Sequence, residues 1–571
     1  MSLNPARLAL ALALSVSAAS AATLHRPLPA GSLERNGTPQ PMQRHAHPHV
    51  LPPALPPTAP FKYAAQGLKR HYGGTPVDVL TYHYDLNRTG WNAAETDLTP
   101  ATVGSGNFGQ LTQLSVDGNV LAQPLLVSNF TMPNGSVHDV LIIATGHDSV
   151  YAFDADTYAR LWHARLGQSQ SSNDVGCGDV VPEYGISSTP VILRSGPDAA
   201  SIYVVAATEP AQYSFHTKLH ELDLATGKDM ISPVEIAPQA KLKNGGTINF
   251  DPQNQWNRAA LAYNNGNLYV GIGSHCDNNA GGISGWLLDY DTTTLKLLHH
   301  FHTIETAENY ELASIWMTGF APAIDDSGNV FVVTGNGAFG KGGRDWGESV
   351  LHLPPDLKRA DDYFTPASYQ QLNNGDVDFG SGGVMLLPTV QGQTAPPMAV
   401  AIGKDAVLYL LNQNKLGKEK AGDAGALQSQ TLGSPGGGTW GGPAYYDGPN
   451  GGMVYVQINN DVLRGYSVAT GSKPALKQVA AGTSQAGYGG SLPIVSSNGG
   501  VSGTGVVWLI RRGATIQLEA YDALALGKPL FAANAGQWSN GAGNSFLTPM
   551  EANGRVYVPA YKTVTVFGLG Q

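Results

Sequence analysis

The chain has few charged residues, and the basic ones do not cluster. Of its 571 residues, 33 are Lys or Arg and 43 are Asp or Glu, so charged residues make up 13% and the formal net charge is −10. Proteins that bind nucleic acid concentrate Lys and Arg on one surface or along one segment. The absence of any basic run therefore argues against a nucleic-acid partner.

Long apolar runs are also missing. The longest candidate, residues 8–16, is too short to span a bilayer, which needs about 20 apolar residues. It follows Arg7 and precedes Ala19-Ser20-Ala21, an order typical of a secretory signal and its cleavage site. We therefore expect residues 1–21 to be a signal peptide and the protein to be periplasmic or secreted. No cysteine lies near the cleavage point, so no lipid anchor is expected there.

Glycine and proline, in contrast, are abundant, with 70 and 37 copies. Residues 22–77 are rich in proline and lack periodicity, which predicts a disordered or extended linker. From residue 78 to residue 571, a stretch of small residues or proline precedes an apolar strand, a turn and a second apolar strand, and this pattern occurs eight times. The repeats open at Ala122, Ser188, Arg258, Ala321, Gly382, Gly441, Ser491 and Leu547.

The repeats recur roughly every 50–70 residues, a spacing that suits the four-stranded blades of a propeller with loop insertions. The sequence therefore predicts an all-β, eight-bladed β-propeller. In the first blade we expect strands at residues 120–127, 140–145, 149–154 and 159–166. The last repeat contains only three strands, so an N-terminal strand at residues 111–116 is predicted to complete it and to close the ring. Residues 81–91 are expected to pack on an outer surface.

Only two cysteines are present, Cys177 and Cys276. In a propeller, the loops that join one blade to the next lie on the same face as the loops between the second and third strands. Cys177 falls in a loop of the first kind and Cys276 in one of the second kind, so we predict that they form a disulfide. Two free, buried thiols are the alternative.

The third strand of the first blade ends in a pattern that recurs more weakly in later blades. Residues 150–157 are followed by Leu161-Trp162, and related segments end at Gly227 and at Gly471. In these features, residues 78–571 resemble the quinoprotein alcohol dehydrogenase-like eight-bladed propellers. In that family, Ala-x-Asp-x-x-Thr-Gly-x-x-x-Trp ends the third strand and begins the fourth, and the Trp docks between blades.

The same resemblance implies a site for pyrroloquinoline quinone (PQQ). Trp316 opens the fourth inner strand, where the family places the indole on which the planar quinone stacks. Lys404 lies where the family has a Lys that reaches the quinone oxygens and stabilises developing negative charge. Independently of the resemblance, Trp316 could simply fill the channel and Lys404 could be a solvated turn residue.

The resemblance also implies a Ca²⁺ ion and a catalytic base. Asn336 matches the family's cation-binding Asn, although Asn-Gly is also an ordinary hairpin turn. Asp376 and Asp378 match the segment that supplies the base, and either could take the alcohol proton; Asp376 is also a candidate ligand of the ion. Two solvated loop aspartates are the alternative.

Other positions match less well. Glu209 is a loose counterpart of the family's Ca²⁺-binding Glu, and Ser188 and Thr189 could contact the cofactor or act as turn donors. The adjacent cysteine pair of the family is replaced by residues 146–149. No Cys-x-x-Cys-His occurs, so electrons would leave to a separate acceptor.

The leading hypothesis is therefore a monomeric quinoprotein dehydrogenase that oxidises an alcohol or sugar with PQQ and Ca²⁺. One alternative is a non-catalytic propeller that binds peptides or proteins. Another is a polysaccharide lyase that uses His275 as base beside Arg258. A wider group on the same face has the mixture of aromatic and charged residues found in carbohydrate pockets: Asp179, Glu183, Tyr184, Trp256, Arg258, His275, Asp277 and Trp346.

Overall fold

The computed structural model describes residues 72–243, 245–277, 283–306, 312–340, 345–513, 515–538 and 546–570, which belong to one compact unit. The expected signal peptide and nearly all of the expected linker lie outside these ranges. Within them, every helix is too short or too polar to cross a bilayer.

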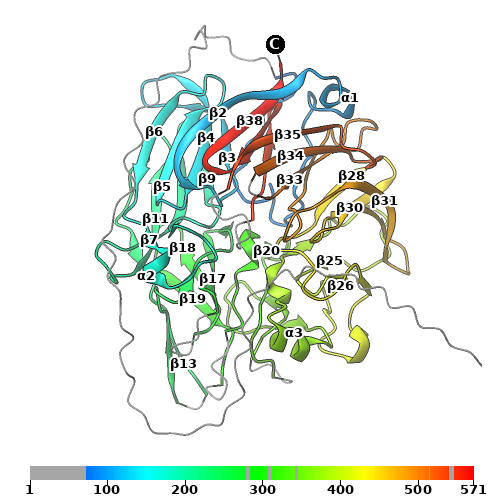
Figure 1. Cartoon of the computed structure of the whole chain (residues 1–571). Coiled ribbons are helices and arrows are strands. Elements are labelled where there is room, and N and C mark those ends of the chain that lie inside the picture. The colour runs from blue at the N-terminus through cyan, green and yellow to red at the C-terminus, as the bar shows by residue number, and fades with distance from the viewer. Residues whose placement is uncertain are drawn as a thin grey trace, which may run out of the picture. The chain divides into compact units, whose positions relative to one another are not determined.

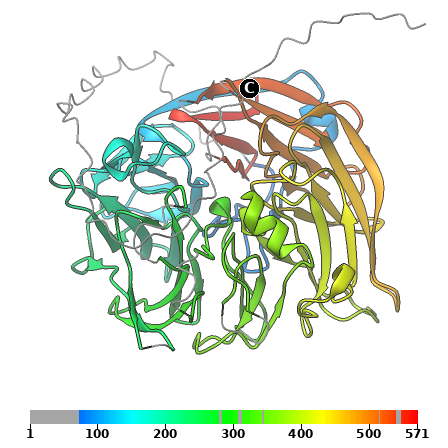
Figure 2. The same ribbon diagram turned by 60° about the horizontal axis from the view of Figure 1, so that its bottom comes forward.

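Eight of the ten sheets among the described residues are four-stranded antiparallel blades, some with a short extra strand, and they follow one another around a central axis, as Figure 2 shows. The predicted eight-bladed β-propeller is therefore confirmed. Blade 1 contains β3 (Leu125–Thr131), β4 (Val137–Thr145), β5 (Ser149–Asp154) and β6 (Arg160–Arg165), and blade 2 contains β9 (Val191–Arg194), β10 (Ala200–Thr208), β11 (His216–Asp223) and β12 (Val234–Glu235). Blade 3 contains β16 (Ala262–Asn264), β17 (Asn267–Ser274), β18 (Trp286–Asp291) and β19 (Leu297–His302). Blade 4 contains β20 (Ala323–Ile324), β21 (Val330–Val333), β22 (Val350–Leu353) and β23 (Asp362–Phe364).

The second half of the ring repeats this plan. Blades 5 to 8 contain β24 (Val384–Leu386), β25 (Met398–Ala401), β26 (Val407–Asn412) and β27 (Gln428–Thr431); β28 (Ala444–Gly448), β29 (Gly451–Val456), β30 (Val462–Ala469) and β31 (Ala475–Gln485); β32 (Ile494–Ser496), β33 (Val506–Arg511), β34 (Thr515–Asp522) and β35 (Phe531–Gln537); and β36 (Met550–Ala552), β37 (Arg555–Pro559), β38 (Tyr561–Leu569) and β2 (Phe108–Asn119).

Short elements lie in the connections and at the sheet edges. They are β1 (Trp91–Asn92), β7 (Gln170–Ser171), β8 (Glu183–Tyr184), β13 (Gln239–Lys241), β14 (Thr247–Asn249), β15 (Gln255–Trp256), α1 (Pro100–Val103), α2 (Ser172–Val175), α3 (Tyr369–Gly375) and the 3₁₀ turns η1 (Met317–Gly319), η2 (Phe379–Ser381) and η3 (Ala421–Asp423). The core lies between neighbouring sheets, where apolar residues such as Val332 of blade 4 and Val400 of blade 5 share one buried cluster.

Blade 1 shows how the recurring pattern works. Asp154 ends β5 and its carboxylate accepts hydrogen bonds from the backbone N–H groups of Asp156 and Thr157, which shapes the turn into β6. The indole of Trp162 then donates to the carbonyl of Leu224 in blade 2, at 2.9 Å. Gly227 (φ 69°) lies against this indole, and a Cβ there would approach the ring to 2.5 Å. The inner strand begins at Leu125, later than expected, because the N–H groups of Val120 and Gln123 donate to Ala560 and Thr189, outside the blade, and Pro124 has no N–H to donate.

The two ends of the propeller meet in blade 8. β2 pairs antiparallel with β38, and Figure 1 shows the two strands side by side. β2 spans residues 108–119 and is therefore longer than the strand expected at residues 111–116. The pairing leaves the sheet with strand order β2-β38-β37-β36.

Residues 79–92 form what we call the N-terminal strap. The prediction that residues 81–91 pack on an outer surface is wrong, because Tyr82, His83 and Arg88 are fully buried. The strap instead crosses the ends of the inner strands and satisfies their backbone groups. Its carbonyls at Leu80, Leu86, Asn87, Thr89 and Gly90 accept hydrogen bonds of 2.7–2.9 Å from Ile192, Ile324, Leu386, Tyr445 and Val495, in blades 2, 4, 5, 6 and 7.

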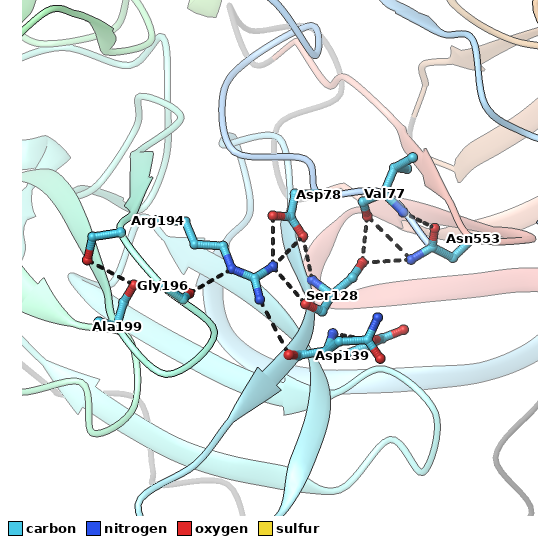
Figure 3. Close-up of polar contacts among 10 residues, drawn as sticks. Val77, Asp78, Ser128, Asp139, Arg194, Gly196, Ala199 and Asn553 are labelled. Carbon is cyan, nitrogen blue, oxygen red and sulfur yellow. Dashed lines mark hydrogen bonds and ion pairs between the residues drawn. The ribbon is translucent and has the colours of Figure 1, made fainter. Parts of the chain in front are cut away.

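Side chains fasten the strap and the residues before it. The guanidinium of Arg88 donates to the carbonyls of Pro322, Tyr82 and Asp85 and to the hydroxyl of Thr81, at 2.8–3.1 Å. Just before the strap, Asp78 forms an ion pair with Arg194 of blade 2, and Val77 is hydrogen-bonded to Asn553 of blade 8 (Figure 3). The N-terminal segment therefore connects blades that are far apart in the sequence.

Glu551 provides a test of this buried region. It is fully buried, accepts a hydrogen bond from Asn92 at 2.8 Å and lies near Glu95. Burial and the Glu95 carboxylate raise the pKa of Glu551 well above its usual value. The folded protein therefore holds a proton that the unfolded chain releases above pH ~4.3, so stability is full below that pH and falls as the pH rises.

We expect Glu551→Gln to remove this pH dependence, because glutamine does not titrate. The melting temperature of the variant should exceed that of the unmodified protein at pH 8, and this difference should shrink at pH 5. The corresponding difference in unfolding free energy should change by up to about 1.4 kcal/mol per pH unit. Asp326→Asn removes an exposed carboxylate from a turn and is the control. A difference that is the same at both pH values would contradict the prediction.

Candidate functional site

Three carboxylates converge on the face that carries the blade-to-blade loops. Asp277 follows β17, Asp376 ends α3, and Asp378 precedes η2. Oxygens of the three groups lie within 4.8 Å of one another. We call Asp277, Asp376 and Asp378 the acidic triad. Burial and the neighbouring Asp378 raise the pKa of Asp277 to about 7, so the triad concentrates negative charge at an electrostatic cost.

Lys404, in the turn between β25 and β26, faces the triad. Its ammonium is paired with Asp378 and lies 3.3 Å from Oδ1 of Asp376. The Lys404 side chain is 10% exposed and that of Asp378 3%, whereas that of Asp376 is 71% exposed. Burial opposes the charge on Lys404, but the two aspartates outweigh it and raise its pKa above the usual value. When all three carboxylates are ionised, they and the one ammonium carry a net charge of −2, which suits a hard cation with oxygen ligands.

Asn336 follows β21 and completes this group. Its backbone N–H donates to Oδ1 of Asp378 at 2.8 Å, and its side-chain NH₂ lies 3.3 Å from Asp277 and 3.4 Å from Asp376. If the side-chain amide of Asn336 is rotated by 180°, its oxygen points to the space between the triad oxygens. A ligand of a cation bound there needs this orientation. Gly335 permits the close approach, since a Cβ there would meet Asp378 at 2.7 Å and the Trp316 nitrogen at 3.0 Å.

Aromatic rings flank the ammonium. The Nζ atom of Lys404 lies 5.6 Å from the ring centroid of Trp316 and 5.6 Å from that of Trp440. Trp316 is half-buried and packs on Gly273, while Trp440 is buried and stacks on Phe546 at 5.8 Å. The arrangement joins flat apolar surfaces to a fixed positive charge and an acidic cluster.

The predicted disulfide between Cys177 and Cys276 is present, with a Cα–Cα distance of 5.6 Å. Cys276 directly precedes Asp277, and both residues have left-handed backbone conformations, with φ of 47° and 48°. Such conformations are costly for residues other than glycine, so they need support from their surroundings. The disulfide supplies a covalent anchor for one arm of the acidic triad.

The structure thus brings together Trp316, Asn336, Asp376, Asp378 and Lys404, and among the described residues no hydrogen bond joins the other three predicted residues to this group. Glu209 lies outside the triad, and its carboxylate accepts from the backbone of Ser171 and Tyr213 at 2.9 and 2.7 Å. The hydroxyl of Thr189 accepts from Gln123 of blade 1 at 2.8 Å. The hydroxyl of Ser188 is buried and has no hydrogen-bond partner among the described residues.

The pair proposed for a lyase is also located. His275 stacks on Trp256 at 5.3 Å and burial lowers its pKa to about 3, while Arg258 donates to the carbonyls of Ser187 and Phe546. His275 and Arg258 are each only 1% exposed. A polymer cannot reach them in this conformation, which removes the support for a lyase.

Sequence reasoning did not assign roles to Asp277 and Trp440. Asp277 had been noted only as part of the wider group on this face, and Trp440 precedes the repeat that opens at Gly441. An aromatic residue at the start of a blade was the available signal for Trp440. For Asp277 the signal was its position beside Cys276.

No family model matches the sequence, and no curated protein matches it either. Solved structures do match the fold. A europium-containing methanol dehydrogenase shares 13% identity at a TM-score of 0.57, covering 87% of this chain and 98% of the other. The quinohemoprotein alcohol dehydrogenase from Comamonas testosteroni shares 15% identity at a TM-score of 0.57, covering 86% and 81%.

A third structure, the quinohemoprotein alcohol dehydrogenase ADHIIG from Pseudomonas putida HK5, shares 13% identity at a TM-score of 0.55 and covers 86% and 80%. At such low identity the likeness concerns the fold. The chain has the eight-bladed propeller fold of these dehydrogenases, in agreement with the resemblance of its blade pattern.

Proposed function

We propose that this protein is a quinoprotein dehydrogenase that oxidises an alcohol or sugar, with PQQ as cofactor and Ca²⁺ beside it. The observation that carries the proposal is the position of Lys404, whose ammonium faces two indoles and three carboxylates at once. The protein would act in the periplasm or outside the cell and pass electrons to a separate acceptor.

The residues present fit both groups. Asp277, Asp376 and Asp378 offer the carboxylate oxygens that Ca²⁺ prefers, and Asn336 can add an amide oxygen. Trp316 offers a half-buried flat surface for a planar ring system, and the buried indole N–H of Trp440 has no partner among the described residues. When bound, PQQ would accept two electrons from the alcohol carbon.

The chain itself would handle the proton. Asp378 is committed to Lys404 and to the N–H of Asn336, whereas the carboxylate of Asp376 is largely exposed. We therefore assign the role of base to Asp376, which would take the hydroxyl proton of the substrate at a carboxylate oxygen. Lys404 would hold a positive charge where the reduced cofactor gains negative charge.

The test is to titrate the purified protein with PQQ by calorimetry, with and without Ca²⁺, and then to offer alcohols and sugars with an artificial electron acceptor. We expect binding that depends on Ca²⁺, followed by reduction of the acceptor. A chain that binds no PQQ at micromolar concentrations with Ca²⁺ present would refute the proposal. A non-catalytic propeller would then be the better interpretation. One observation in its favour is that Glu209, the counterpart of the family's Ca²⁺-binding Glu, lies outside the triad.

A further inference from the structure

A cavity of about 300 Å³ lies at the junction of residues 72–76 with blades 1 and 8. Tyr72, Gly74 and Pro76 line it from the residues before the strap. Asp139 lines it from β4, and Gly554 from the turn between β36 and β37. Figure 3 shows Asp139 and Asn553 at this junction, beside Val77 and Ser128.

The cavity lies on the face opposite the acidic triad. Its lining includes the turns between first and second strands and between third and fourth strands. The triad comes from the loop after the second strand of blade 3 and from the blade-to-blade loop before blade 5. In an antiparallel four-stranded blade, these two kinds of loop emerge at opposite edges. Occupation of the cavity therefore does not depend on a cofactor at the triad.

Negative charge dominates the lining. Asp97, Asp139 and Asp156 line the cavity, against one cation of fixed charge, Arg555, which donates to Asp156 at 2.8 Å. His138 also lines it but is engaged with Asp154. The three carboxylates and the guanidinium leave a net charge of −2.

The carboxylates also have spare capacity to accept hydrogen bonds. Within the described residues, four hydrogen bonds reach them, and an ionised carboxylate can accept about four by itself. The donors are the backbone N–H of Asn129 to Asp139 at 2.7 Å, Arg555 to Asp156, and Gly73 N–H and the Thr96 hydroxyl to Asp97, both at 3.2 Å. Burial and the nearby Asp156 raise the pKa of Asp139, and the positive charge of Arg555 offsets this increase only in part.

The spacing argues against a single metal ion held by all three groups. The described residues contain two sets of metal-capable side chains with ligand atoms within 4.8 Å of one another, and none of the cavity carboxylates belongs to either. A ligand that satisfies them must therefore carry separated donors. The volume also exceeds that of an ion and leaves room for a small organic molecule.

We propose that this cavity binds a small organic dication, a molecule with two ammonium groups held several ångströms apart. One ammonium group would be held by Asp139 and Asp156, and the other by Asp97 beside Tyr72. Because these residues come from the N-terminal segment and from blades 1 and 8, the ligand would connect the parts that close the ring, and its binding would stabilise the fold by mass action.

The test uses the full chain at constant ionic strength, with 1,4-diaminobutane as the probe and 1,4-butanediol as its uncharged counterpart. Calorimetry should detect binding of the diamine alone, and the melting temperature should rise with its concentration. Binding should weaken with added salt, since the attraction is between charges.

Variants locate the site. We expect Asp139→Asn to raise the dissociation constant for the diamine at least tenfold. Asp326→Asn, which removes the same charge from an exposed turn, should leave it unchanged, and so should Asp376→Asn on the opposite face. The melting temperature without ligand shows whether each variant is folded.

Several results would overturn the proposal. The first is the absence of both heat and a melting shift at millimolar diamine, and the second is equal binding of the diol, which indicates a polyol site. The third is displacement of the diamine by an equal concentration of Ca²⁺ at constant ionic strength, which indicates a metal site at the cavity. The fourth is undiminished binding of the diamine by Asp139→Asn. Loss of PQQ-dependent activity has no bearing on any of them, so failure here and failure of the proposed dehydrogenase are distinguishable.

Discussion

Lys404→Met is expected to abolish acceptor reduction by the protein loaded with PQQ and Ca²⁺, with a loss in kcat of at least about a hundredfold. Removing one preorganised charged group from the position where negative charge develops typically costs ~10²–10³ in rate. The same substitution leaves Asp378 buried without its counter-charge, which should cost about 3–5 kcal/mol of stability.

These two effects can be separated. The double variant Lys404→Met with Asp378→Asn removes the buried charge and should recover much of the lost stability. Because Asp378 is also a candidate Ca²⁺ ligand, the single variant Asp378→Asn is the reference, and the double variant should lose whatever activity this reference retains. Lys358→Met, at a side chain that is 76% exposed, is the control and should retain full activity. Activity that returns together with stability in the double variant would show that Lys404 only supports the fold.

Replacing both cysteines with serine is expected to lower stability by about 4–5 kcal/mol, because the disulfide closes a separation of 99 residues in the unfolded chain. The same change should weaken the binding of Ca²⁺, since Cys276 anchors the neighbouring Asp277 in an unfavourable backbone conformation. Denaturant unfolding gives the first quantity, and calorimetric titration of the protein with Ca²⁺ gives the second.

Reducing the disulfide in the unmodified protein gives a second way to measure how much the disulfide contributes to Ca²⁺ binding. Reduction and double substitution should weaken Ca²⁺ binding to the same degree, while Asp376→Asn should weaken it with the disulfide intact. If the cysteine-free protein is folded and binds Ca²⁺ as tightly as before, the disulfide does not position the triad.

The sequence was sufficient for the parts of the site that lie at repeated positions of the blades. Trp316, Asn336 and Lys404 each mark the start or end of an inner or second strand, and the propeller geometry brings such positions to one face. Asp277 and Trp440 were missed because their roles depend on convergence of loops from blades 3 and 6. Glu209 was assigned by position in its repeat, whereas its loop turns the carboxylate toward the backbone of Ser171.

The strap illustrates a different limit. Many blade strands are short apolar runs bounded by turns, so the blades could be counted from the sequence. Residues 79–92 mix aromatic, charged and small residues without a period, and their hydrogen-bond partners are the exposed backbone ends of six blades. Such a segment has no local signal, because the surface that orders it exists only after the sheets have assembled.

The strap has a consequence for biosynthesis. Its residues leave the ribosome before those of every blade, yet Val495, one of its partners, is made about 400 residues later. The end of the strap at Gly90 must therefore wait for its partner until the seventh sheet has been translated, and its docking there can serve as the last step by which a newly made chain becomes locked.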